Sequence, residues 1–161
     1  MALSTVIPLT TKEGFEYLLN FTEFEKSALP DDIDIPLVDV TIEARIPMEQ
    51  YNNAGTLFNM SSFIKGFLEE HNVIIYFYCS KDDILKSPSK DSFSNQEYRS
   101  HLFDTMFLRS EKDGIYINEK IIIDDNNEKH FIHLMSISEN EKYFNKISTT
   151  ILSFDPNKTR L

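Results

Sequence analysis

Two stretches near the start of the chain alternate between apolar and polar residues, which is the period of a β-strand with one buried face. The apolar positions of the first stretch are Phe15, Tyr17, Leu19 and Phe21, and those of the second are Val38, Val40, Ile42 and Ala44. A connector with Pro30 separates them, and Pro47 ends the second run. The pattern therefore predicts two half-buried strands, over residues 15–22 and 38–44.

The period changes after Thr56, where large side chains recur at steps of three and four. These positions are Leu57, Met60, Ile64, Phe67 and His71. We therefore expect an amphipathic helix that is capped by Thr56 and ends near residues 71–72. Residues 73–79, VIIYFYC, then run almost without a polar residue. Such a segment is typical of a strand covered on both faces, so we expect it in the middle of the sheet.

The second half of the chain begins with a polar segment, residues 80–92, long enough to be a mobile or functional loop. Ser94 is suited to cap the helix that follows, with Glu97 as its capping-box partner. The β-rich runs 115–123 and 130–137 are joined by DDNNE, which indicates a hairpin. A last helix is expected over residues 139–152, before Pro156.

These elements give the order ββαβαββα without an internal repeat or a dividing linker. A chain of 161 residues is most often one domain with its own core. We therefore predict a single α+β (or α/β) domain over residues 1–161, with flexible ends at about residues 1–10 and 156–161. It should contain a mixed five-stranded sheet with three packed helices.

Charge and cysteine content narrow the function classes. Lys and Arg together number 16 against 26 Asp and Glu, a formal net charge of −10. This sign repels phosphate backbones and anionic lipid surfaces, so we expect neither a nucleic acid nor a membrane as partner. A single cysteine, Cys79, excludes an intramolecular disulfide, and the first residues lack the basic and apolar regions of a signal peptide. These features favour a cytoplasmic protein.

Arg99 stands out in the second predicted helix, where the sequence reads RSHLFDTMF. On a helical wheel it falls at about 100°, inside an apolar arc of about 40° to 180°. Angles are counted from Tyr98, and the arc is formed by Leu102, Met106, Phe103 and Phe107. His101 and Asp104 fall on the opposite side. A buried guanidinium needs a carboxylate or several carbonyl groups, so we expect Arg99 to pair with Asp82 or Asp83, just after the central strand.

This strand and helix resemble an uncharacterised bacterial family, domain of unknown function 6169, which is found largely in Bacteroidota. That family has a Y-x-x-x-F strand, an apolar strand ending in Cys-Asp, an Asp-x-Arg element and R-x-R-L-F-x-x-W-F. The matching residues are Tyr17, Phe21, Cys79, Asp82 or Asp83, Arg99, Leu102, Phe103 and Phe107. Ser80, His101 and Met106 depart from the pattern. The resemblance implies a fold and a bacterial source rather than a chemistry.

Candidate catalytic and metal-binding residues have plainer structural explanations. Cys79 alternates with core residues and reads as a small buried hydrophobe. His130 and His133 are three apart in a predicted strand, so they point to opposite faces and cannot share a metal. His71 and His101 lack companions at ligand spacing, and the glycines form no phosphate-binding motif. We predict no catalytic residue, no metal and no cofactor.

Two acidic groups suggest a function. Asp31, Asp32 and Asp34 precede the second strand, and Asp124 and Asp125 lie in the hairpin. We interpret them as an acidic surface that binds a basic protein, as antitoxins and immunity proteins do. The sequence therefore favours a non-catalytic protein-binding module, such as an antitoxin, immunity or defence-accessory protein. The alternative is a small enzyme with an anion-binding site formed by Arg99, Asp82, Asp83 and His101 beside the 80–92 loop.

Overall fold

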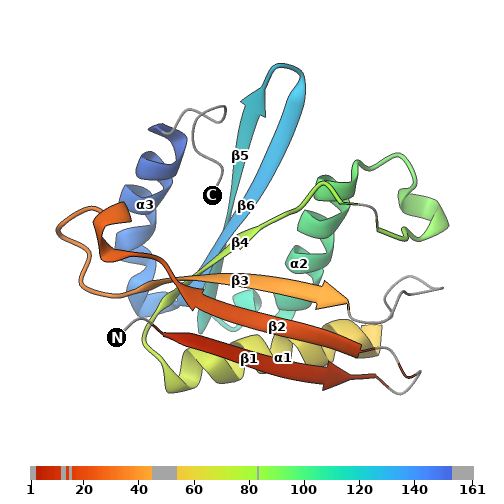
Figure 1. Ribbon diagram of the computed structural model, residues 1–161, viewed down its shortest axis with the longest axis horizontal. Helices are drawn as coiled ribbons and strands as arrows, with labels where there is room; N and C mark the ends of the chain where they lie inside the picture. The colour runs from red at the N-terminus through yellow and green to blue at the C-terminus, as the bar shows by residue number, and fades with distance from the viewer. Residues whose placement is uncertain (1–2, 12–13, 15, 45–53, 83, 154–161) are drawn as a thin grey trace.

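The computed structural model describes residues 3–11, 14, 16–44, 54–82 and 84–153. Its strands are β1 (Ser4–Thr10), β2 (Glu16–Glu23), β3 (Leu37–Ala44), β4 (Ile74–Tyr78), β5 (Tyr116–Asp125) and β6 (Glu128–Ile137). Its α-helices are α1 (Ala54–Glu70), α2 (Asn95–Lys112) and α3 (Glu141–Ser153) (Figure 1). Short 3-10 turns are η1 (Lys26–Ala28), η2 (Pro88–Lys90) and η3 (Ser138–Asn140). Phe15, Pro47, Asp83 and residues 156–161, on which parts of the sequence analysis rest, lie outside this description.

The strands form one mixed sheet in the order β1-β2-β3-β4-β6-β5. β3 and β4 pair in parallel, and the other neighbours pair antiparallel. The parallel pair requires a long crossover, which α1 provides. β4 has a partner on each side, so the prediction that the apolar run 73–79 is a central strand is confirmed.

The sheet has six strands, whereas the sequence pattern predicts five. The additional strand is β1, an edge strand paired only with β2. Of its seven residues only Leu9 is buried, and Val6 is 55% exposed. An edge strand with one buried side chain and a proline carries little hydrophobic alternation, so its pattern is weak. The observed order is therefore βββαβαββα.

Helix boundaries follow local capping chemistry where the sequence offers it. The Oγ of Ser94 accepts a hydrogen bond from the backbone N–H of Glu97 at 3.2 Å, which confirms Ser94 as the N-cap of α2. α1 begins at Ala54, two residues before Thr56, so Thr56 lies within the helix instead of capping it. The β5–β6 hairpin closes through Asn126 and Asn127, whose positive φ values of 47° and 70° suit a tight two-residue turn.

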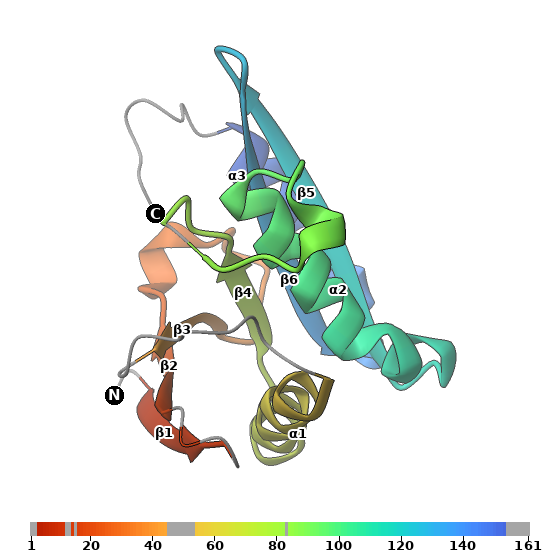
Figure 2. The same cartoon turned by 90° about the vertical axis from the view of Figure 1, so that its right-hand side faces the viewer.

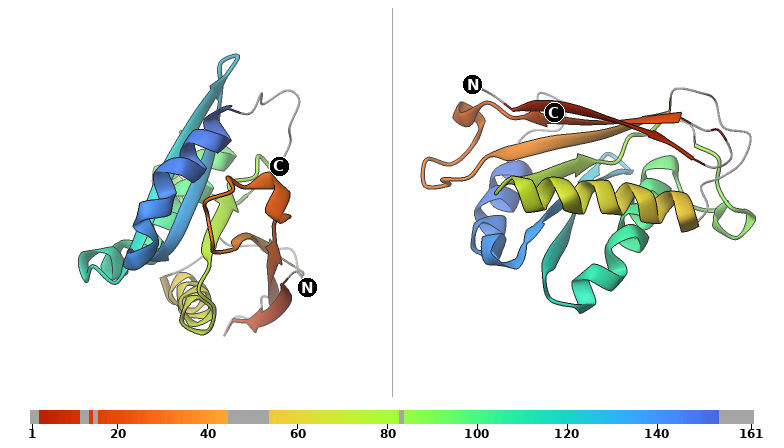
Figure 3. Two further views of the ribbon diagram at one scale, coloured as in Figure 1. Left: turned by 90° about the vertical axis from the view of Figure 1, so that its left-hand side faces the viewer. Right: turned by 90° about the horizontal axis from the view of Figure 1, so that it is seen from below.

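Helices cover the two faces of the sheet unequally. α1 and α2 pack on one face, where α2 lies in front of the β5–β6 hairpin and α3 lies behind it (Figure 2). From the opposite side, α3 lies in front of the same hairpin (Figure 3). No helix among the described residues covers the outer face of β1, β2 and β3, which is turned toward the viewer in Figure 1. Among the described residues, this half of the sheet therefore has one face packed by a helix and one face without a helix, which we call the open face.

Candidate functional site

Arg99 fastens α2 to the chain that leaves the central strand. It is half-buried, and its guanidinium donates hydrogen bonds to the carbonyl oxygens of Ser80, at 2.8 Å, and of Asp82. The predicted partner Asp82 is thus found beside Arg99, and its main-chain carbonyl accepts one of these hydrogen bonds. Several carbonyl groups can satisfy a guanidinium that cannot lose its charge. Arg99 therefore holds the helix in place through the backbone.

The loop after β4 is tied to the first turns of α2. Lys86 Nζ donates to the side-chain oxygen of Asn95 at 2.8 Å, and Asn95 Nδ2 donates to the carbonyl of Lys81 at 3.1 Å. The backbone N–H of Ser87 donates to the Tyr98 hydroxyl at 3.2 Å. The polar side chains of this loop and helix start thus bond to one another. They hold the loop against α2, where the sequence suggested a mobile or functional segment.

His101 has a different environment from Arg99. Its ring packs edge-to-face on Phe93, with centroids 5.7 Å apart. Burial, and secondarily the neighbouring Lys90, lower the pKa of His101 below its ordinary value. The side chain of His101 is half-buried, whereas the helical wheel predicts that this side of α2 faces solvent. His101 and Arg99 thus have separate partners, which gives no support to a joint anion site.

A chain of polar side chains, unnoticed in the sequence, crosses the interface between α2 and the hairpin. The Oγ of Ser100 lies 2.8 Å from His133 Nε2, and His133 Nδ1 lies 2.8 Å from Asn118 Oδ1. Asn118 Nδ2 donates to Asp104 at 3.0 Å, and Lys120 forms an ion pair with the other oxygen of Asp104 at 2.7 Å. Ser100 and His133 are buried, with 1% and 0% of their surface exposed.

These contacts fix the direction of each hydrogen bond. Because Asn118 Oδ1 can only accept, His133 Nδ1 must carry the proton, and Nε2 then accepts from the Ser100 hydroxyl. Burial lowers the pKa of His133 to about 4, although Asp104 acts in the opposite direction. His133 is therefore neutral at neutral pH. The series of hydrogen bonds therefore runs from Ser100 in the core to the Asp104–Lys120 ion pair at the surface.

The order hydroxyl, imidazole and side-chain oxygen is also that of a serine-protease-like triad. A catalytic serine must reach a substrate, and Ser100 is enclosed between α2 and the sheet. Phe103 and His133 are buried beside it, with ring centroids 4.8 Å apart. The chain of hydrogen bonds therefore serves to satisfy buried polar groups rather than to activate a nucleophile.

The helical wheel predicts the wrong side of α2 as the one that faces the sheet. Its buried stripe is centred on Gln96, Ser100, Phe103 and Phe107. This stripe turns Asp104 toward β5, where the wheel expected solvent, and leaves Arg99 at the flank. Ser100 lies one turn before Asp104 and on the same side of the helix as Phe103. This position would indicate a buried hydroxyl only if a polar partner for it were expected. The partner, His133, is 33 residues away, and only pairing in space reveals it.

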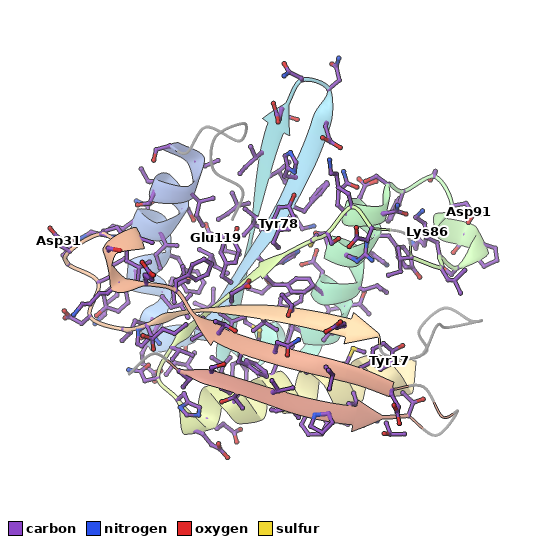
Figure 4. The ribbon with its side chains drawn as sticks, viewed as in Figure 1. Tyr17, Asp31, Tyr78, Lys86, Asp91 and Glu119 are labelled. Atoms are coloured by element: carbon purple, nitrogen blue, oxygen red, sulfur yellow. The ribbon has the colours of Figure 1, made fainter. Side chains whose placement is uncertain are left out.

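The acidic residues occupy two separate projections. Asp31, Asp32 and Asp34 are exposed on the segment between η1 and β3, and Asp32 forms an ion pair with Lys146 of α3. In the hairpin, Asp124 is exposed and Asp125 lies 3.8 Å from His130. Asp31 and the hairpin tip lie at different sides of the molecule (Figure 4). The expected acidic surface is thus divided into two patches.

Three further residues, Cys79, His130 and His133, have the positions that the sequence indicates. Cys79 is fully buried in the core, and burial raises the pKa of its thiol to about 12. His130 and His133 point to opposite faces of β6. The first lies 2.9 Å from the Tyr78 hydroxyl, and the second lies beneath α2.

Arg99→Ala should lower the free energy of unfolding by about 1–3 kcal/mol, because two carbonyl groups lose their charged donor. Thr105→Ala is the matched control on the exposed side of α2 and should change stability by about 0.5 kcal/mol or less. Urea unfolding measures both. Equal midpoints for Arg99→Ala and the natural chain would contradict the fastening role.

Stability should depend on pH through His133. The unfolded chain binds a proton at the ordinary histidine pKa of about 6.5, whereas the folded chain resists it down to a pKa of about 4. This contribution to stability is complete above the unfolded pKa and is lost as pH falls toward the folded pKa, by up to about 1.4 kcal/mol per pH unit. Urea midpoints between pH 7 and 5.5 should fall less steeply in His133→Gln than in the natural chain, and equal slopes for the two proteins would contradict this role of His133.

Cys79 should resist a thiol reagent in the native protein, because its thiol is enclosed and protonated. An aromatic disulfide reagent should label it at once in guanidinium chloride and only on the timescale of unfolding without denaturant. Fast native labelling would show that Cys79 is accessible. Since the chain has no other cysteine, the readout reports this residue alone.

Comparison with known proteins adds no assignment to this geometry. No protein-family model, no curated protein and no solved structure matches the chain. Within the described ranges, no helix is long and apolar enough to cross a membrane. The same ranges contain no group of three or more His, Cys, Asp or Glu residues arranged to hold a metal ion. The site must therefore be interpreted from its own residues.

Proposed function

We propose that this chain is a non-catalytic protein-binding module whose partner is a basic protein. The observation that carries the proposal is the open face of β1, β2 and β3, opposite α1. Strand register assigns to this face Ser4, Val6, Pro8, Thr10, Glu16, Leu18, Asn20, Thr22, Asp39, Thr41 and Glu43. All of them are at least partly exposed.

The chemistry of the open face is acidic and partly apolar. Its charged residues are Glu16, Asp39 and Glu43, and no lysine or arginine is among the described residues of the face. Val6, Pro8 and Leu18 add apolar surface beside the carboxylates. Protein interfaces combine such apolar area with polar groups, and a surface of one sign favours a partner of the opposite sign. This combination fits a basic protein surface and disfavours a nucleic acid.

The segment before β3 adds further negative charge beside the open face. Asp31 and Asp34 are exposed next to the end of β3 that carries Leu37 and Asp39. Together with the net charge of −10, they would steer a cationic partner toward this side of the molecule. We further propose that the chain acts in the cytoplasm as an antitoxin, immunity or defence-accessory protein. We also propose that it comes from a bacterium and is related to the family that it resembles, domain of unknown function 6169.

The alternative, a small enzyme around Arg99, has less support. Its proposed anion-binding group already donates to two carbonyl oxygens, and His101 packs on Phe93. An anion would have to displace these contacts. We therefore prefer the binding function.

Affinity capture can test the open face directly. The tagged chain should retain one stoichiometric basic protein from a lysate of its source organism. The variant Glu16→Gln, Asp39→Asn, Glu43→Gln should lose it. The control Glu70→Gln, Asp91→Asn, Asp113→Asn removes as much charge from exposed residues elsewhere and should retain it. Equal capture by both variants would contradict an interface on this face.

Association with that partner should slow as salt rises. The Debye length falls from about 30 Å at 0.01 M to about 10 Å at 0.1 M, so steering by exposed carboxylates is screened. Stopped-flow or surface-binding kinetics should show the decrease mainly in the association rate constant. An association rate that does not change over this range would exclude electrostatic steering.

A further inference from the structure

The outer side of α1 carries large apolar side chains that are exposed in the single chain. α1 packs on the face of the sheet opposite the open face, and seen from below it is the foremost element (Figure 3). Met60, Ile64 and Phe67 are buried against the sheet, whereas Phe58 is 64% exposed and Phe63 is 37% exposed. Two phenylalanine rings in water forgo the free energy that burial would provide, so a covering surface would be stabilised here.

Gly66, on the same outer side, has no structural role within its own chain. It lies in the interior of α1, its φ is outside the left-handed range, and a Cβ added there would meet none of the described atoms within 4 Å. A glycine inside a helix lowers helix stability relative to alanine, so a compensating contact is expected. Phe58, the exposed Ser62 and Gly66 follow one another at steps of four along the helix. The row thus changes from a large side chain to a small one and then to none.

This row is complementary to itself when a second copy is turned end for end. Ser62 is the midpoint of α1, which runs from Ala54 to Glu70. In an antiparallel pair centred on Ser62, Phe58 of each copy therefore lies opposite Gly66 of the other. A two-fold contact requires a surface that matches itself in this way. A shallow crossing angle of about 20° would keep the two helices side by side over their whole length.

The charges at the ends of α1 favour the same antiparallel direction. The first turn of the helix contains no acidic residue and the last turn no basic residue, and the helix ends with the exposed Glu69 and Glu70. Because a helix is partly positive at its N-terminus and partly negative at its C-terminus, these carboxylates are unfavourably placed on their own helix. In the antiparallel pair they lie beside the N-terminal turn of the other copy, where a carboxylate is favourable.

We propose that a second copy of this chain covers the outer side of α1, through an antiparallel contact in which Phe58 packs on Gly66 of the other copy. The contact is independent of the proposed function, because it lies across the sheet from the open face and does not involve that face. A single helix pair buries less surface than a typical stable interface. The dimer should therefore be weak, with a dissociation constant in the micromolar range.

Sedimentation velocity from micromolar to millimolar concentration should show a reversible equilibrium between monomer and dimer. Phe58→Ser should raise the dissociation constant about tenfold or more, as expected for an aromatic side chain at the centre of an interface. Leu108→Ser is the matched control, because it removes a side chain of α2 that is 54% exposed, and it should leave the dissociation constant unchanged. A monomer at every concentration, or equal weakening by both variants, would overturn the proposal.

Gly66→Gln tests the other half of the contact. The added side chain enters open space in the single chain, and glutamine favours a helix more than glycine does, so the urea midpoint should not fall. The same side chain would occupy the place of Phe58 of the other copy, so dimerisation should be lost. A folded Gly66→Gln variant that dimerises as tightly as the natural chain would contradict the contact.

Ser62→Cys tests the register, because it places one thiol of each copy at the two-fold axis. A short bifunctional thiol reagent should link two copies of this variant. It should not link copies of the control Thr105→Cys, whose new thiol lies on the exposed side of α2. Cys79 is present in both variants, so any reaction at that residue appears equally in the control. Equal cross-linking of the two variants would overturn the antiparallel contact centred on Ser62.

Discussion

The requirement to bury β4 on both faces determines how the rest of the chain is placed. Ile75 and Phe77 face α1 and α2, while Ile74 and Tyr76 face the side that α3 covers. Burying one large apolar side chain contributes about 1.5–3 kcal/mol, so leaving either face of this strand open would be costly. Three helices over a six-stranded sheet meet the requirement. They do so only around the centre, so within the part of the chain that the structure describes no helix covers the outer face of β1–β3.

Polar contacts decide where α2 sits once hydrophobic packing has brought it to the sheet. In the second turn of α2, Arg99 bonds to the backbone after β4 and Ser100 bonds to His133 of the hairpin, and one turn later Asp104 bonds to Asn118 of the hairpin. Apolar side chains tolerate small shifts, whereas hydrogen bonds of 2.8 Å do not. The helix is thus fixed both to the central strand and to the hairpin, and the loop between β4 and α2 is fixed with it.

The sequence predicts features that depend on neighbours along the chain. The apolar run of β4, the cap at Ser94 and the hairpin turn at Asn126 and Asn127 all follow from local chemistry. β1 was missed because its single buried residue and Pro8 leave no clear period. The Ser100–His133 contact was missed because each residue is ordinary in its own segment. Arg99 is an intermediate case. Its sequence position indicates that the guanidinium needs partners, but the carbonyl groups that accept its hydrogen bonds depend on the path of the chain after β4.

The two edges of the sheet limit how copies of this chain can associate. β1 carries Pro8, which has no N–H to donate, and β5 carries Glu119 and Lys120 midway along its length. Prolines and charges at edges discourage the addition of further strands, which is the usual route to fibrous aggregation. The partly apolar open face of β1–β3 can therefore be displayed without the sheets of separate copies joining into a continuous sheet.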